Sequence, residues 1–181
     1  MSDQTIAENC APTLAGIKTG NLFSTKVRDA VSFQKELCRL NHILTAKGLR
    51  AVPVRYMDGR ALIYLYRPDR LSKDIRRREV AAILKEQGYT LESADRAVVQ
   101  LVNKLKNQTE FPHEIGVFLG YPAEDVRAFM HDSHSGFKLV GYWKVYGDKE
   151  KAMKIFDSFS RCTATYCRAI KNGKSLEQLI S

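Results

Sequence analysis

A β-hairpin signal in the segment 50–67 sets the strongest limit on the fold. Two stretches of alternating apolar and polar residues meet there at Asp58-Gly59. Asp-Gly supplies the positive φ values that a tight two-residue turn needs, so the pattern predicts two antiparallel strands. Pro53 has no backbone N–H to donate, so the first strand is expected at a sheet edge or beside a bulge.

Helical patterns occupy most of the remaining chain. Pro12 is tolerated in the first turn of a helix, so a helix is expected to begin about there, after a short helical start near 5–9. This placement puts Cys10 beside a helix N-terminus. Longer helices are predicted over the ranges 29–47, 71–87, 93–107, 122–131 and 148–171, and a short helix is predicted over 175–180.

Two further strands are predicted outside the hairpin. The short apolar run 114–119 is consistent with a buried strand, and 137–146 is rich in aromatic and β-branched residues. The chain is therefore expected to be α+β, with about four mostly antiparallel strands among six or seven helices. We expect one domain over 1–181, with the C-terminal helices of 148–180 packed on the same core.

Composition favours a cytoplasmic, globular protein. Hydrophobic residues make up 44% of the chain, and no apolar run approaches the roughly 20 residues that cross a bilayer. The first nine residues have neither a basic start nor an apolar stretch, so no signal peptide is expected. The four cysteines are interpreted as free thiols of a reducing compartment, and the five-residue spacing of Cys162 and Cys167 argues against a zinc site shared by these two.

The net charge of +9 leaves two interpretations open. The basic segment 67–78 would place Arg70, Lys73 and Arg77 on one helix face, with Arg76 beside them, as a stripe that contacts nucleic acid or phosphate. A solvated helix face that keeps the protein soluble explains the same charges. No nucleic-acid motif accompanies the segment, so nucleic-acid binding is not the favoured interpretation.

Several motifs together resemble a known bacterial family, domain of unknown function 3793. The resemblance covers nearly the whole chain and is carried by the segments 10–18 (CAPTLAGIK), 21–23 (NLF), 111–122 (FPHEIGVFLGYP), 124–126 (EDV) and 141–146 (GYWKVY). It implies no established chemistry. It does suggest a redox or iron context, with a flavodoxin-type redox protein as a partner.

A second resemblance is to papain-like cysteine peptidases, including the double-glycine peptidases. Cys10 followed by Ala11-Pro12 is similar to their nucleophile segment, Gln4 stands six residues earlier, and His113 opens a segment similar to their histidine strand. This resemblance implies a thiol hydrolase or acyl transferase with Cys10 as nucleophile, His113 as general base and Gln4 as oxyanion donor. Ala11 departs from the glycine of that motif, and no Asn or Asp is placed to orient His113.

A binding protein is the favoured alternative. In this interpretation Cys10, His113, Tyr121 and Trp143 line a site for a small ligand, an unidentified cofactor or a protein partner. Core packing of Cys10 and Trp143 explains the same residues without any site. The distance from the Cys10 sulfur to the His113 ring would separate these interpretations.

Overall fold

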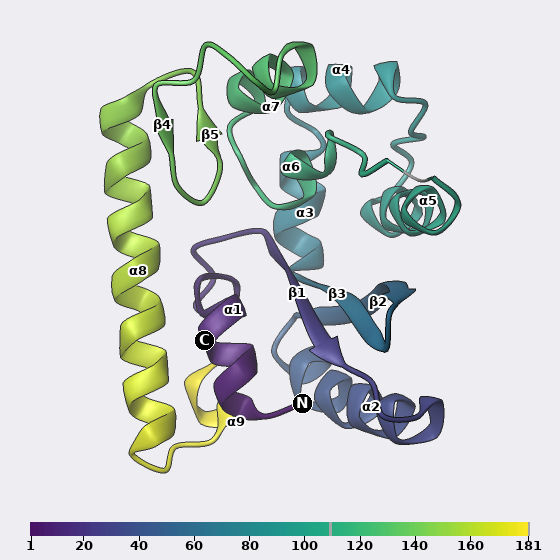
Figure 1. The fold of residues 1–181 in the computed structure, drawn as a ribbon, viewed down its shortest axis with the longest axis vertical. Helices are drawn as coiled ribbons and strands as arrows, with labels where there is room; N and C mark the ends of the chain where they lie inside the picture. The colour runs from purple at the N-terminus through teal and green to yellow at the C-terminus, as the bar shows by residue number, and fades with distance from the viewer. Residues whose placement is uncertain (109, 181) are drawn as a thin grey trace.

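A three-stranded antiparallel sheet lies at the centre of the fold, with helices on both of its faces (Figure 1). The computed structural model describes residues 1–108 and 110–180. Strand β3 (Arg60–Tyr66) is central, between β1 (Gly20–Lys26) and β2 (Arg50–Met57). The predicted α+β class and the hairpin are both confirmed, since Asp58 and Gly59 have φ values of 52° and 70° between β2 and β3.

Pro53 lies where the sequence predicts. β2 is an edge strand, and its register against β3 shifts between Pro53 and Arg55. β1 was not predicted, because its first residues, Gly20-Asn21, are typical of a loop. It forms a strand by pairing along its whole length with β3, from Gly20 opposite Tyr66 to Lys26 opposite Arg60.

One face of the sheet, here called the α1 face, carries α1 (Asp3–Leu14), α2 (Ala30–Ala46) and parts of α8 (Lys149–Lys171) and α9 (Leu176–Leu179). The expected helix start at Pro12 is wrong, because α1 begins at Asp3 and continues through Pro12. Pro12 lies in the last turn, where a missing N–H removes only one backbone bond.

The opposite face, here called the α5 face, borders a core to which five helices contribute. They are α3 (Pro68–Asp74), α4 (Arg78–Glu86), α5 (Ala94–Asn107), α6 (Ile115–Phe118) and α7 (Ala123–His131). The structure confirms the helices predicted over 93–107 and 122–131. The single helix predicted over 71–87 is wrong, since the chain turns between α3 and α4, where the N–H of Arg77 donates to the carbonyl of Asp74.

The strand predicted over 114–119 is also wrong, because this run forms α6. Gly120, with φ of 76°, ends it: the N–H groups of Gly120 and Tyr121 donate to the carbonyls of Val117 and Gly116. This pattern is the glycine-dependent Schellman end of a helix. An apolar run alone does not distinguish a buried helical turn from a buried strand.

The strand predicted over 137–146 is instead a small hairpin. It consists of β4 (Leu139–Val140) and β5 (Lys144–Val145), which are antiparallel. Gly141 lies in its turn against Phe156 of α8, and a Cβ at Gly141 would overlap the Phe156 ring. The absence of a side chain therefore lets the hairpin pack directly on α8.

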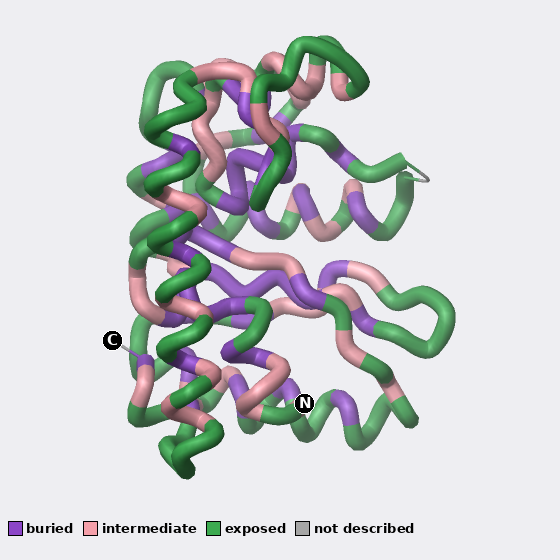
Figure 2. The backbone as a smooth tube through the Cα atoms, turned by 60° about the vertical axis from the view of Figure 1, so that its left-hand side comes forward, coloured by how far each residue is buried: buried purple, intermediate pink, exposed green. Residues whose placement is uncertain are grey.

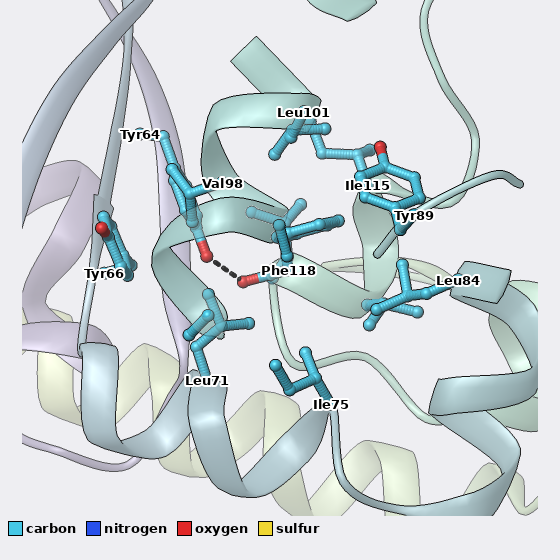
Figure 3. Packing of buried hydrophobic residues seen from close by; sticks show 14 of the residues in the cluster. Tyr64, Tyr66, Leu71, Ile75, Leu84, Tyr89, Val98, Leu101, Ile115 and Phe118 are labelled. Carbon is cyan, nitrogen blue, oxygen red and sulfur yellow. Dashed lines mark hydrogen bonds between the residues drawn. The ribbon is translucent and has the colours of Figure 1, made fainter. Parts of the chain in front are cut away.

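Alternating residues of β3 contribute to separate cores. Ile63 and Leu65 pack on the α1 face, whereas Tyr64 and Tyr66 pack on the α5 face. In the α5-face core, the Tyr64 hydroxyl donates to the carbonyl of Phe118 over 2.6 Å (Figure 3). This bond ties the central strand to α6.

A third, smaller core joins the β4–β5 hairpin to α8. It contains Trp143, Val145, Ala152 and Phe159. α8 runs along the length of the molecule and so contacts both this core and the α1-face core (Figure 1). Buried residues are concentrated on the strands and on the inward sides of the helices (Figure 2). Within the described ranges, no helix combines the length and apolar character that a membrane span requires.

Candidate ligand-binding site

A cavity of about 420 Å³ lies between α6, α7 and the β4–β5 hairpin. Its walls are mainly aromatic and aliphatic, and they include Phe111, His113, Tyr121, Phe129, Val140 and Trp143. Ligand sites of soluble proteins have volumes of roughly 300–1,000 Å³ and the same mainly apolar lining. Its size and lining make this cavity the candidate site.

Asp125 of α7 holds the hairpin side of the cavity in place. Its buried carboxylate accepts the indole N–H of Trp143 over 2.7 Å and the backbone N–H groups of Tyr146 and Gly147 over 2.8 Å each. Hydrogen bonds to a charged acceptor are stronger than those between neutral groups. The Trp143 ring is therefore fixed at the cavity wall before any ligand arrives.

Tyr121 stacks on Trp143. Their ring centroids are 5.0 Å apart, and Phe156 of α8 meets the Trp143 ring edge-on from a third element at 4.6 Å. Burial raises the pKa of the Tyr121 hydroxyl to about 12, so this ring carries no charge at neutral pH. Together the three rings form a rigid apolar wall.

His113 lies exposed at the edge of the cavity, with its ring 5.0 Å from that of Phe129. The next residue, Glu114, is buried and fixes this part of the chain. Its carboxylate accepts from Lys104 of α5 over 2.8 Å and from the Tyr89 hydroxyl over 3.0 Å. An anchored backbone therefore presents the imidazole, which can donate or accept a hydrogen bond at the cavity edge.

Lys144 adds a positive charge to the lining. Its ammonium donates to the carbonyl of Ser133 over 2.6 Å and lies 5.8 Å from the Phe129 ring and 4.8 Å from the Phe137 ring. Such contacts between a cation and aromatic faces are attractive. The polar groups that the cavity can offer to a ligand are therefore mainly hydrogen-bond donors.

Comparison with protein-family models matches residues 6–180 to the family described as "Protein of unknown function (DUF3793)". The chain belongs to this family. The resemblance predicted from the motifs is confirmed, and all the residues that line the cavity lie within the matched range. Searches of curated proteins and of solved structures returned no significant match. Nothing in these comparisons supports the papain-like resemblance.

Three of the four predicted binding residues of this DUF3793 protein surround one cavity. They are His113, Tyr121 and Trp143, whereas Cys10 is not among the lining residues. Phe129 and Asp125 also belong to the site but were not predicted. Asp125 is an acid in the first turn of α7, and that position is explained equally well by the helix dipole, so the sequence carries no signal of its hydrogen bonds to the hairpin.

Cys10 lies in the α1-face core and is completely buried. The expectation that it adjoins a helix N-terminus is wrong, because it is the eighth residue of the twelve-residue helix α1. Burial raises the pKa of its thiol far above the usual value, an effect that the nearby charge of Lys18 only partly offsets. The thiol is therefore protonated at neutral pH.

The three peptidase-like residues are divided between the two faces of the sheet. Gln4 and Cys10 lie on α1, and the Gln4 amide donates to Glu8 over 2.7 Å. His113 precedes α6, whose residues Ile115 and Phe118 belong to the α5-face core. The structure does not bring these three side chains together.

The basic segment 67–78 contacts the chain's own carbonyl and carboxyl groups. Arg67 donates to the carbonyls of Thr13 and Leu14 at the end of α1. Arg70 donates to the carbonyl of Gly16, and Arg77 pairs with Asp74 at 3.3 Å. The predicted common face of Arg70, Lys73 and Arg77 is wrong, because Arg77 lies beyond the end of α3; Lys73 and Arg76 are exposed.

The described residues contain no group of three or more His, Cys, Asp and Glu side chains placed to hold a metal ion. All four cysteines are free thiols: Cys38 is exposed, Cys162 and Cys167 are half-buried, and Cys10 is buried.

Proposed function

We propose that this DUF3793 protein is a cytosolic binding protein for a small planar molecule, held in the cavity between α6, α7 and the β4–β5 hairpin. The observation that carries the proposal is an aromatic cavity with fixed walls. Tyr121, Phe129 and Trp143 offer ring surfaces, and planar ligands gain most from stacking on such surfaces. The four free thiols agree with a reducing compartment.

The rigidity of the walls favours binding. Asp125 orients the Trp143 indole through its N–H, and Tyr121 is already stacked on that indole. A site that is ordered before binding loses less conformational entropy when the ligand arrives. Binding is therefore expected to need little rearrangement of the hairpin.

The polar groups of the lining suggest how a ligand is oriented. The carboxylate of Asp125 already accepts three N–H groups, so it has little capacity left for a ligand. His113 at the edge and the Lys144 ammonium are among the lining groups that can contact polar atoms of a ligand. We expect the planar body of the ligand to lie among the rings and a hydrogen-bond acceptor to face His113 or Lys144.

Thiol hydrolysis has weaker support. The Cys10 thiol is buried and protonated, and it packs on the α1 face of the sheet, whereas the cavity lies beyond the α5 face. A nucleophilic cysteine needs access to the substrate and a thiolate. We therefore assign Cys10 no part in the proposed site.

The chain's single tryptophan gives a direct test, because Trp143 is in the cavity wall. The probe 1-anilinonaphthalene-8-sulfonate, which offers a planar naphthalene ring, should quench Trp143 emission saturably, with energy transfer to the probe. Phe129→Ala removes one ring and should weaken binding about ten-fold. Tyr56→Ala is the matched control, because it removes an exposed ring from β2, away from the cavity, and should leave affinity unchanged.

Circular dichroism and thermal unfolding should first show that both variants fold. Linear, unsaturable quenching would contradict the proposal. So would equal probe affinity of the folded Phe129→Ala variant and the wild type.

A further inference from the structure

Lys18 is an unusual lysine, because its side chain is almost entirely buried. It follows α1 in the loop that leads to β1, and its backbone N–H donates to the carbonyl of Pro12 over 3.0 Å. Only 4% of its surface is exposed. Lysines are rarely buried to this degree unless a carboxylate or hydrogen-bond acceptor accompanies them.

Within the described parts of the chain, the Lys18 ammonium makes neither a hydrogen bond nor an ion pair. Two aromatic rings lie near it instead: its nitrogen is 5.3 Å from the centroid of the Tyr121 ring and 5.9 Å from that of the Phe159 ring. The nearby thiol of Cys10 is protonated and does not neutralise it. The carboxylate of Asp74, which contacts the adjacent Thr19, accepts from that hydroxyl and pairs with Arg77.

The nitrogen itself is not sealed from solvent. Among the described residues, every fully buried side-chain nitrogen or oxygen atom has a hydrogen-bond partner. Because Lys18 Nζ has none, it is not fully buried and keeps a small solvent-accessible surface. The result is a primary amine beside two aromatic rings, with no competing hydrogen bond and a small solvent-accessible surface.

We propose that Lys18 is a reactive amine that forms an imine with a small aldehyde or ketone. The lone pair of neutral Nζ adds to the carbonyl carbon, and a proton moves from nitrogen to the carbonyl oxygen to give a carbinolamine. Loss of water then leaves a C=N bond between Lys18 and the former carbonyl carbon. The step consumes one carbonyl compound, releases one water and needs neither oxidant nor reductant.

The electrostatic setting supports this chemistry. Burial lowers the pKa of Lys18 to about 8, with Cys10 acting weakly in the opposite direction. About one tenth of such an amine is neutral at pH 7, against roughly 0.03% for a lysine of ordinary pKa. Lysines that are desolvated in apolar pockets are activated as nucleophiles in this way.

The test is reductive methylation of the wild-type chain with formaldehyde and sodium cyanoborohydride, followed residue by residue with mass spectrometry. Formaldehyde is the smallest aldehyde, so it suits an amine with little exposed surface, and the reductant traps the imine. At pH 7 we expect Lys18 to react about ten-fold faster than the exposed Lys47 and Lys171. This advantage should shrink as the pH rises to 10, where the exposed lysines also lose their protons.

Slower reaction of Lys18 than of the exposed lysines at every pH would overturn the proposal and leave Lys18 as a structural cation between two rings. Lys18→Arg keeps the charge without a primary amine, so its peptide should lose the label while the other lysines react as before. Butyraldehyde in place of formaldehyde tests whether a larger carbonyl compound reaches Lys18; fast reaction with formaldehyde alone would restrict the class to carbonyl compounds of fewer than four carbons.

Discussion

The α1-face core and the cavity between α6, α7 and the β4–β5 hairpin differ in how completely they bury their apolar residues. On the α1 face, Cys10, Leu14 and Ile63 have no exposed surface. Beyond the α5 face, the segment from Phe111 to Trp143 leaves apolar groups open around a cavity. Both regions are apolar, and α8 packs on both.

The comparison distinguishes side chains that only pack in a core from side chains that can also contact a ligand. A side chain that is fully enclosed by its neighbours has no surface left for a ligand, whatever its chemistry. The aromatic groups around the cavity are fixed by Asp125 and Glu114 and still have free ring surface. The sequence motif around Cys10 therefore belongs to the core, and the motif around His113 belongs to the candidate site.

The largest expected difference is in thiol reactivity. Iodoacetamide at pH 7.5 should alkylate the exposed Cys38 about 10³-fold faster than Cys10, because Cys10 is buried and its raised pKa keeps it protonated. Mass spectrometry of timed samples measures both rates. Unfolding in urea should make the two rates similar. Fast alkylation of Cys10 in the folded chain would restore the thiol-enzyme hypothesis.

Truncation of apolar side chains should also distinguish the two regions. Leu14→Ala creates a void in the sealed core and should lower the free energy of unfolding by about 3 kcal/mol. Val140→Ala at the cavity, where the side chain is 59% exposed, should change it by less than about 0.5 kcal/mol. Urea denaturation measures both. Equal losses would mean that the cavity wall is packed as tightly as the core.

Asp125→Asn tests how the cavity wall is held. The amide has only one acceptor oxygen for three N–H donors, so stability should fall by about 2 kcal/mol. Trp143 emission should shift to longer wavelength as the hairpin loosens, and probe affinity should fall. Asp157→Asn, at an exposed position of α8, is the matched control. Unchanged emission in Asp125→Asn would show that the hairpin is held by its apolar contacts alone.

Alkaline pH gives the smallest expected effect. The pKa of Tyr121 is about 12 in the folded chain and about 10 in an unfolded chain. The Tyr121 hydroxyl therefore makes its full contribution to the free energy of unfolding below pH 10, and this contribution declines as the pH rises towards 12. At pH 11 the wild type should have lost about 1 kcal/mol more than Tyr121→Phe, as measured by urea denaturation. Parallel stability curves would show that solvent already reaches the hydroxyl.

Local chemistry made part of the fold predictable. Asp58-Gly59 and Pro53 define the hairpin and its bulge, because turn geometry and a missing N–H act within a few residues. β1 could not be predicted, because its strand geometry depends on pairing with β3 some 40 residues later. The run 114–119 was misassigned because its helix depends on a glycine end at Gly120 rather than on apolar periodicity.

The candidate site was predictable only in part. His113, Tyr121 and Trp143 were predicted from their motifs, and the structure places all three around one cavity. The resemblance to papain-like peptidases groups Cys10 with His113, and Pro12 predicts a helix start beside it, whereas α1 continues through Pro12 and buries the thiol. The contacts of Lys18 with Tyr121 and Phe159 arise from three distant segments, and no local pattern predicts them.

The most direct test of the binding site is the indole N–H resonance of Trp143, which is the single tryptophan signal in a nitrogen–proton correlation spectrum. During titration with 1-anilinonaphthalene-8-sulfonate, this resonance and the amide of Gly116 should shift along one saturable curve, while the amide of Cys10 stays in place. Shifts centred on α1, with an unmoved indole signal, would contradict the assignment of the cavity as the binding site.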